Sequence, residues 1–287
     1  MDNKNSAQIY KSNALVEASY RLSVAEQRIM LTCMSKIRKD QPITDDQLYS
    51  VSVSEISNLT GVMSNAAYSE LENAALRLKR REVRINVEPN GNGKKAKTLI
   101  TGWVQTIAYV ESEGRIELRF SKDMLPYLTE LSEQFTQYAL ADVAKMTSAY
   151  GIRLYELLIQ YQHGGCSREF SLDELRELLR LENKYPSTKD FKKWVIEPAV
   201  EQINEYSPIR VNWSQRKTGR RISHIQFDFT KKARIAKPRK KQVEIPSHSD
   251  HPINENLAPK NLNIANRSTQ EIKTASSVIE QIKMNLG

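Results

Sequence analysis

The sequence predicts an α+β protein in which one unit, made of helices and a hairpin, occurs twice. Three observations support this fold class. Capping boxes open two helices, short stretches of alternating apolar residues predict strands, and the same order of elements returns after about residue 148. A three-helix bundle with a two-stranded flap is a winged helix-turn-helix. We therefore expect tandem winged helix-turn-helix domains at residues 1–131 and 132–232, followed by a basic, disordered C-terminal tail at 233–287.

The first unit contains a capping box at Ser23–Glu26, where a hydroxyl and a glutamate each satisfy a backbone amide at the start of a helix. Gly61 is suited to end a brief helix, and Pro89 begins a strong turn signal between two strands. In chain order we predict helices at 24–37, 54–60 and 64–81, strands at 49–53 and 82–87, a strand through Trp103 to Val110, and a strand at 115–120.

The second unit repeats this order and has its own capping box at Ser171–Glu174. Pro198 lies inside its last helix, and because an internal proline costs about 3 kcal/mol we expect a kink or a new helix start there. The linking segment 122–131 is expected to be helical despite Pro126. We predict helices at 148–161, 171–181 and 188–206, a strand at 168–170, and a hairpin of 209–213 and 222–229. The buried stripe expected for the last helix is Phe191, Trp194 with Val195, Ala199, Ile203 and Tyr206.

The net charge of +9 points to a polyanionic partner, nucleic acid first. Residues 231–242 carry seven cations and no acid, which leaves only +2 for the remaining chain. A DNA-binding face in the body must therefore come from the placement of charges, and on composition alone an ordinary soluble protein is the alternative. The tail is rich in Pro, Asn and Ser from 246 to 266, which is typical of disorder, and a capping box at Ser268 precedes a short helix.

Composition and motifs also argue against several classes of protein. Two cysteines make no disulfide framework, and the absence of a long apolar stretch or secretory signal predicts a cytoplasmic protein with no membrane contact. A nicking enzyme would need paired histidines for a metal and a tyrosine nucleophile. The four histidines form no His-x-His pair, and no phosphate-binding glycine loop occurs. We therefore expect no catalysis, metal or cofactor.

Candidate DNA contacts of the first unit surround the helix predicted at 64–81. Polar side chains near its start can touch base edges or phosphates, and cations gather at its end and on the following hairpin. These candidates are Ser64, Asn65, Ser69, Arg77, Arg80, Arg81, Lys94 and Lys95. The alternative is a solvated cationic helix end, which also suits the helix dipole, in a unit with another role such as dimer formation.

The second unit carries the stronger signal for DNA binding. Three lysines lie at the N-terminal end of the helix at 188–206, the end that a recognition helix inserts into the major groove. The hairpin adds five cations, and no acidic residue occurs between Arg210 and Ile222. The candidates are Lys189, Lys192, Lys193, Arg210, Arg216, Lys217, Arg220 and Arg221. The alternative is a basic hairpin that is merely exposed to solvent.

Several segments resemble the iteron-binding plasmid replication initiators, the family of Rep proteins with two winged helices. The resemblance runs from about Tyr10 to Phe229 and includes the proline inside the last helix. The segments that carry it are Asn13–Val16, Leu22–Arg28, Ser148–Leu158, Phe170–Leu175, Phe191–Val200 and Ile203–Asn204.

The resemblance implies that monomers bind direct repeats, called iterons, in duplex DNA at a replication origin, promote opening of the origin, and recruit the host initiator and the replicative helicase. It implies that homodimers, in equilibrium with monomers and formed mainly through the first domain, bind an operator inverted repeat and repress their own gene. It also implies that chaperones shift dimers to monomers and that the second domain gives the main base readout. A winged-helix transcriptional repressor without initiation activity is the rival interpretation.

Overall fold

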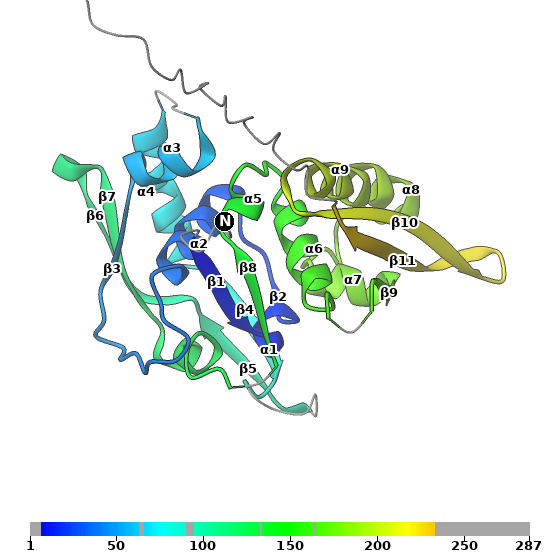
Figure 1. Cartoon of the computed structure of the whole chain (residues 1–287), viewed down its shortest axis with the longest axis horizontal. Helices are drawn as coiled ribbons and strands as arrows, with labels where there is room; N and C mark the ends of the chain where they lie inside the picture. The colour runs from blue at the N-terminus through cyan, green and yellow to red at the C-terminus, as the bar shows by residue number, and fades with distance from the viewer. Residues whose placement is uncertain (1–6, 63–65, 90–94, 133, 164, 233–287) are drawn as a thin grey trace, which may run out of the picture. The chain divides into compact units, whose positions relative to one another are not determined.

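The computed structural model describes residues 7–62, 66–89, 95–132, 134–163 and 165–232 of the 287-residue chain (Figure 1). Contacts group residues Met1–Arg234 into one compact unit. The tail predicted at 233–287 and its short helix lie outside the described residues. Within the described ranges, the α+β fold class and the two successive winged helices are confirmed.

The first winged helix combines three main helices with two three-stranded antiparallel sheets. The sheets have the strand orders β2-β4-β5 and β3-β7-β6. The elements are β1 (Gln8–Ser12), α1 (Asn13–Val16), β2 (Ser19–Tyr20), α2 (Val24–Met34), β3 (Tyr49–Ser52), α3 (Val53–Thr60), α4 (Ala67–Leu78), β4 (Glu82–Val87), β5 (Lys95–Gly102), β6 (Val104–Val110), the 3-10 turn η1 (Glu111–Glu113) and β7 (Arg115–Phe120).

Local signals set the start of α2 and the end of α3 as predicted, whereas α2 ends at Met34 and not at residue 37. The Ser23 hydroxyl accepts from the Glu26 amide at 3.3 Å, and the Glu26 carboxylate accepts from the Ser23 amide at 2.7 Å, which confirms the capping box. Helix α3 ends at Gly61, whose φ of 74° is a left-handed conformation that suits glycine. The apolar stripe of α4 is buried at Leu71, Ala74, Ala75 and Leu78.

The strand predicted to run through Trp103 is instead divided there, so that prediction is wrong. Strand β5 pairs with β4, whereas β6 pairs with β7 in the other sheet. Trp103 is only 1% exposed, and its ring meets the ring of Tyr20 edge to face with centroids 4.7 Å apart. The large indole is therefore buried at the point where the chain passes from one sheet to the other.

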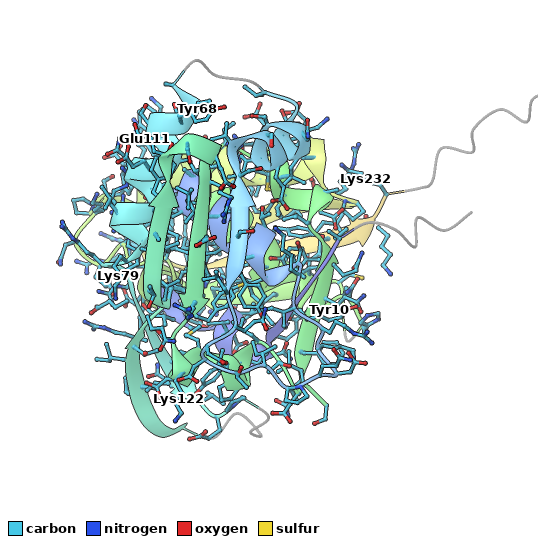
Figure 2. The ribbon with its side chains drawn as sticks, turned by 90° about the vertical axis from the view of Figure 1, so that its left-hand side faces the viewer. Tyr10, Tyr68, Lys79, Glu111, Lys122 and Lys232 are labelled. Atoms are coloured by element: carbon cyan, nitrogen blue, oxygen red, sulfur yellow. The ribbon has the colours of Figure 1, made fainter. Side chains whose placement is uncertain are left out.

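The tip of the β6–β7 hairpin needs a glycine for two reasons. Gly114 has a φ of 55°, and a Cβ at this position would lie 2.2 Å from the Tyr68 ring. Tyr68 of α4 lies near Glu111 at this tip (Figure 2). The close approach therefore connects the start of α4 to the hairpin.

The second half of the described chain forms the other winged helix, whose long hairpin extends beyond its helices (Figure 1). Its sheet has the order β10-β11-β9. The segment predicted as a helix at 122–131 is a 3-10 helix that ends earlier, at Tyr127. The elements are η2 (Lys122–Tyr127), β8 (Phe135–Ala139), α5 (Ala141–Ala144), α6 (Ala149–Ile159), β9 (Ser167–Ser171), α7 (Leu172–Leu178), α8 (Thr188–Phe191), the π-helical turn η3 (Lys192–Ile196), α9 (Glu197–Tyr206), β10 (Ile209–Thr218) and β11 (Arg221–Lys231).

The second capping box and the second hairpin are also confirmed. The Ser171 hydroxyl accepts from the Glu174 amide at 3.1 Å, and the Glu174 carboxylate accepts from the Ser171 amide at 3.3 Å. In the hairpin, Trp213 pairs with Phe227. Gly219 lies at the turn with a left-handed φ of 61°, so the predicted turn position is correct.

Pro198 is accommodated without breaking the last helix. The helical run continues from α8 through the π turn into α9, and Pro198 lies in the first turn of α9. The Glu197 amide donates to the Lys192 carbonyl, a bond that spans five residues instead of four. A proline has no amide hydrogen and crowds the carbonyl of the preceding turn. The wider turn relieves this crowding, and helices often carry such turns at functional positions.

A buried charged cluster joins the N-terminal strand to helix α6. Strand β1 pairs antiparallel with β8, and Lys11 of β1 donates to the Glu156 carboxylate at 2.5 Å. Arg153 donates to the other Glu156 oxygen at 2.8 Å and to the backbone oxygens of Val16 and Ala18 at 3.0 Å each. All three charged side chains are at most 4% exposed.

Two tyrosine hydroxyls complete the shell around the Glu156 carboxylate. Tyr20 donates to it at 3.1 Å and Tyr138 at 2.5 Å. Burial alone would raise the pKa of this carboxyl, but Lys11 and Arg153 lower it to about 2, below its usual 4.5. The ionised carboxylate therefore stabilises the fold at neutral pH, and this contribution is lost as the pH falls through the interval between these two values.

We predict that Glu156→Gln lowers the free energy of unfolding by about 3–5 kcal/mol at pH 7, because it leaves two buried cations without a counter-charge. Urea unfolding followed by circular dichroism measures the difference. The gap between wild type and variant should narrow below pH 4.5. Glu201→Gln, at an exposed position of α9, is the control and should change stability by no more than about 0.5 kcal/mol. Equal stability of all three proteins would contradict this role of Glu156.

Candidate nucleic-acid interface

The three candidate lysines of the second winged helix lie at the start of its last helical run. Lys189 and Lys193 are exposed. Lys192 is half-buried, donates to the side-chain oxygen of Gln215 at 2.9 Å, and lies 5.8 Å from the ring centroid of Trp213. Two lysines are therefore presented to solvent, while the third connects the helix to strand β10 of the hairpin.

The hairpin presents all five of its predicted cations to solvent. The exposed candidates are Arg210, Arg216, Lys217, Arg220 and Arg221. Arg216 differs, because both ends of its guanidinium donate to the Glu169 carboxylate of β9 at 2.7 Å. No acid occurs between Arg210 and Ile222, but β9 pairs with β11 in the sheet and supplies this one. Glu169 therefore neutralises part of the basic surface.

In the first winged helix, two candidate arginines hold a buried carboxylate. Arg77 donates to Glu26 at 3.2 Å, and Arg81 donates to both oxygens of Glu26 at 3.0 Å. The Glu26 side chain is fully buried. Each arginine remains partly exposed, but its charge is used to balance Glu26, which also caps α2.

The other candidates of the first unit are more dispersed. Ser69 and Arg80 are exposed on α4 and just after it. Helix α4 also exposes Glu70 and Glu72 near its start, which lowers the positive charge of that end. Lys95 lies in strand β5. Three candidates lie outside the described residues, namely Ser64, Asn65 and Lys94.

Cations from both winged helices meet at Glu82, an arrangement that is not predicted from the sequence. Arg180, which follows α7, donates to the Glu82 carboxylate at 3.2 Å, and Arg84 of β4 lies 3.4 Å from the same oxygen. Nearby, the Ser19 hydroxyl donates to the Glu177 carbonyl at 2.6 Å. No sequence signal pairs residues so far apart in the chain, because the contact depends on how α7 packs against β2.

Trp194 was predicted in the buried stripe of the last helix, and the structure corrects this. Its side chain is 55% exposed, whereas Val195 and Ile196 are each only 1% exposed. Regular α-helical spacing would place Trp194 beside Phe191. The π turn spreads one turn over five residues, so two residues after Trp194 face the core and Trp194 turns outward.

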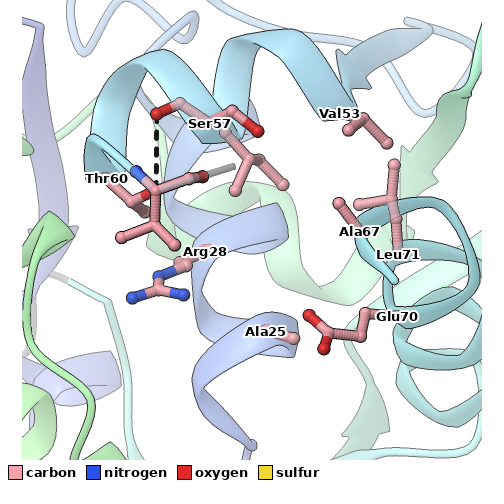
Figure 3. A pocket seen from close by; sticks show the side chains of 10 residues that line it. Ala25, Arg28, Val53, Ser57, Thr60, Ala67, Glu70 and Leu71 are labelled. Atoms are coloured by element: carbon pink, nitrogen blue, oxygen red, sulfur yellow. Dashed lines mark hydrogen bonds between the residues drawn. The ribbon is translucent and has the colours of Figure 1, made fainter. Parts of the chain in front are cut away.

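A pocket lies between α2, α3 and α4 in the first winged helix (Figure 3). Its wall is mainly apolar, with Val53 and Leu71 among the lining residues, and Arg28 and Glu70 contribute opposite charges. Because these charges offset each other, the pocket adds nothing to the basic surface.

Among the residues that the structure describes, no cluster of three or more histidine, cysteine, aspartate or glutamate side chains could hold a metal ion. Over the same ranges, no helix is both long enough and apolar enough to cross a membrane.

Two family models match most of the chain. One is described as Initiator Replication protein, WH1, and matches residues 8–159; the other is Initiator Rep protein, WH2, and matches residues 171–229. A replication initiation protein of Escherichia coli is 28% identical over 228 residues, which cover 77% of this chain and 70% of that protein. The PI protein of Escherichia coli is 23% identical over 257 residues, covering 80% of this chain and 84% of that protein.

A solved structure shows the same fold. The crystal structure of Pi initiator protein in complex with iteron DNA matches with a TM-score of 0.65 and 21% identity, over 80% of this chain and 99% of that chain. The two winged helices and their exposed cations define a DNA-binding protein. The chain belongs to the family of initiator replication proteins, in which one winged helix follows another.

We predict that Arg81→Ala lowers the free energy of unfolding by about 1–2 kcal/mol, because it removes two hydrogen bonds from a buried carboxylate while solvent screens part of the loss. Arg80→Ala is the matched control, because Arg80 is the preceding residue and its side chain is exposed. The free energy of unfolding of this variant should stay within about 0.5 kcal/mol of that of wild type. Thermal and urea unfolding measure both. If the two variants lose the same stability, Arg81 does not have the structural role assigned to it.

Proposed function

We propose that this protein initiates plasmid replication by binding iterons, direct repeats at the origin in duplex DNA. Membership of the initiator replication protein family supports this, and so does the relative whose structure was solved with iteron DNA. The observation in this chain that carries the proposal is the pairing of a helix that exposes Lys189 and Lys193 with a hairpin that exposes Arg220 and Arg221.

The second winged helix supplies the main DNA contact in this proposal. Its last helical run enters the major groove, where a helix fits and every base pair presents a distinct edge. The hairpin binds phosphates beside that groove, which sets register and affinity rather than sequence choice. Lys192 donates to Gln215 and so connects the helix to the hairpin, and Arg216 is oriented by Glu169.

The first winged helix contributes fewer available cations, and we propose that it serves mainly in dimer formation and in DNA backbone contact. Arg77 and Arg81 balance Glu26, and α4 exposes two acids near its start. Contact with phosphate is assigned to Arg80 and to the basic residues of the β4–β5 hairpin. In this scheme residues 1–131 and 132–232 are the two functional domains, and homodimers at an inverted repeat repress the protein's own gene.

Initiation also requires partners, which we propose from the family. Monomers bound to iterons would promote origin opening and recruit the host initiator and the replicative helicase, and chaperones would shift dimers to monomers.

Footprinting on the DNA that flanks the gene tests the proposed function. We expect the full chain to protect several direct repeats, and a plasmid that carries this DNA should replicate only when the protein is supplied. Protection of a lone inverted repeat, without support of plasmid replication, would instead make the protein a transcriptional repressor.

We predict that Lys193→Ala and Arg220→Ala each weaken binding to the protected DNA. Each variant should lower the slope of log affinity against log salt concentration by about 0.9, the value for one lost phosphate contact. Lys122→Ala, at an exposed lysine of η2 (Figure 2), is the control and should leave the slope unchanged. Fluorescence anisotropy over a salt series provides the measurement. Wild-type affinity and slope in both test variants would remove these residues from the interface.

A further inference from the structure

Trp194 is the largest side chain that the second winged helix exposes in its described part. Trp194 is 55% exposed, although the neighbouring Val195 and Ile196 are buried. An exposed tryptophan loses the free energy that burying its rings would gain. Such a side chain is typical of the centre of a recognition surface, where it becomes buried on binding.

The surroundings of Trp194 are those of the proposed DNA contact. The Lys193 ammonium lies 4.8 Å from the indole ring centroid, and Lys189 is exposed on the preceding turn. The ammonium is attracted to the ring face, which holds the indole beside the cation. An apolar ring flanked by cations fits a polyanionic partner that also presents an apolar group. A wholly apolar partner would leave these cations without counter-charges.

The π turn accounts for the outward orientation of this ring. With regular α-helical spacing, Trp194 would lie beside Phe191 and fill the core. The wide turn at Lys192–Ile196 brings Val195 and Ile196 inward instead and turns the indole away from the core. The helix therefore presents the indole and the Lys193 ammonium together at the part of the surface that enters the groove in the proposed function.

We propose that Trp194 is a specificity-determining residue that reads the C5-methyl group of a thymine in the major groove. The methyl group is the one apolar group that a base pair exposes there, and apolar side chains recognise thymine by contact with it. The indole supplies the apolar surface, while Lys193 neutralises the phosphate next to the same base. This inference rests on the proposed function, because it requires the helical run to lie in the major groove.

Single thymine-to-uracil substitutions test the proposal, since uracil lacks only the methyl group and keeps the hydrogen-bonding edge. Each thymine of one protected repeat is replaced in turn, and the affinity of the full chain is measured. Losing contact with one buried methyl group corresponds to about a fourfold loss of affinity. We expect this loss at one or two adjacent positions for wild type.

The Trp194→Ala variant must then be measured on the same set of DNA duplexes. It should bind the natural repeat more weakly than wild type, and the sensitive uracil positions should have no further effect on it. Trp194→Phe keeps an apolar ring and should restore part of the methyl sensitivity. Arg220→Ala is the matched control, because it removes a proposed phosphate contact of the hairpin and leaves the pairing of Lys193 with the indole intact: it should weaken binding to every duplex and keep the methyl sensitivity.

Two results would overturn the inference. In the first, each uracil substitution changes the affinity of wild type and of Trp194→Ala by the same factor. In the second, Trp194→Ala binds the natural repeat with wild-type affinity, which would leave the indole available for a protein partner. If wild type protects no repeat at all, the proposed function itself fails. If it protects repeats but shows no coupling between the methyl group and Trp194, only the role of Trp194 fails.

Discussion

The fold of the described chain depends on keeping one buried carboxylate charged. Glu156 lies on α6 among side chains that come from β1, β2 and β8, and it is held by Lys11, Arg153 and two tyrosine hydroxyls. An isolated charge at such depth would be strongly unfavourable. The cluster forms only when these elements are all in place, so it ties the N-terminal strand and the first winged helix to the start of the second.

A second buried carboxylate follows the same principle within the first winged helix. Glu26 caps α2 with one oxygen and receives Arg77 and Arg81 from the end of α4. Removing one partner of such a group costs more than the pair contributes. Cations at the end of a helix therefore have to be assigned to structure or to DNA by their contacts, since charge alone does not distinguish them.

Much of the architecture could be predicted because its signals are local. The capping boxes at Ser23 and Ser171 and the helix stop at Gly61 depend on backbone groups within four residues. The failures occurred where neighbours come from distant segments. Trp103 divides a strand, because its ring packs against Tyr20, which comes from a distant part of the chain.

The candidate interface shows the same division. The sequence alone determined which cations of the last helical run and of the hairpin are exposed. Their exposure follows from helical spacing in the helix and from the alternation of apolar and polar residues in the strands. Tertiary structure alone decided that Glu169 engages Arg216, that Glu82 lies between Arg84 and Arg180, and that a π turn exposes Trp194. The reason is physical. Backbone periodicity and capping act over a few residues of one chain segment, whereas charge pairing and burial depend on which segments, distant in sequence, are brought together by packing.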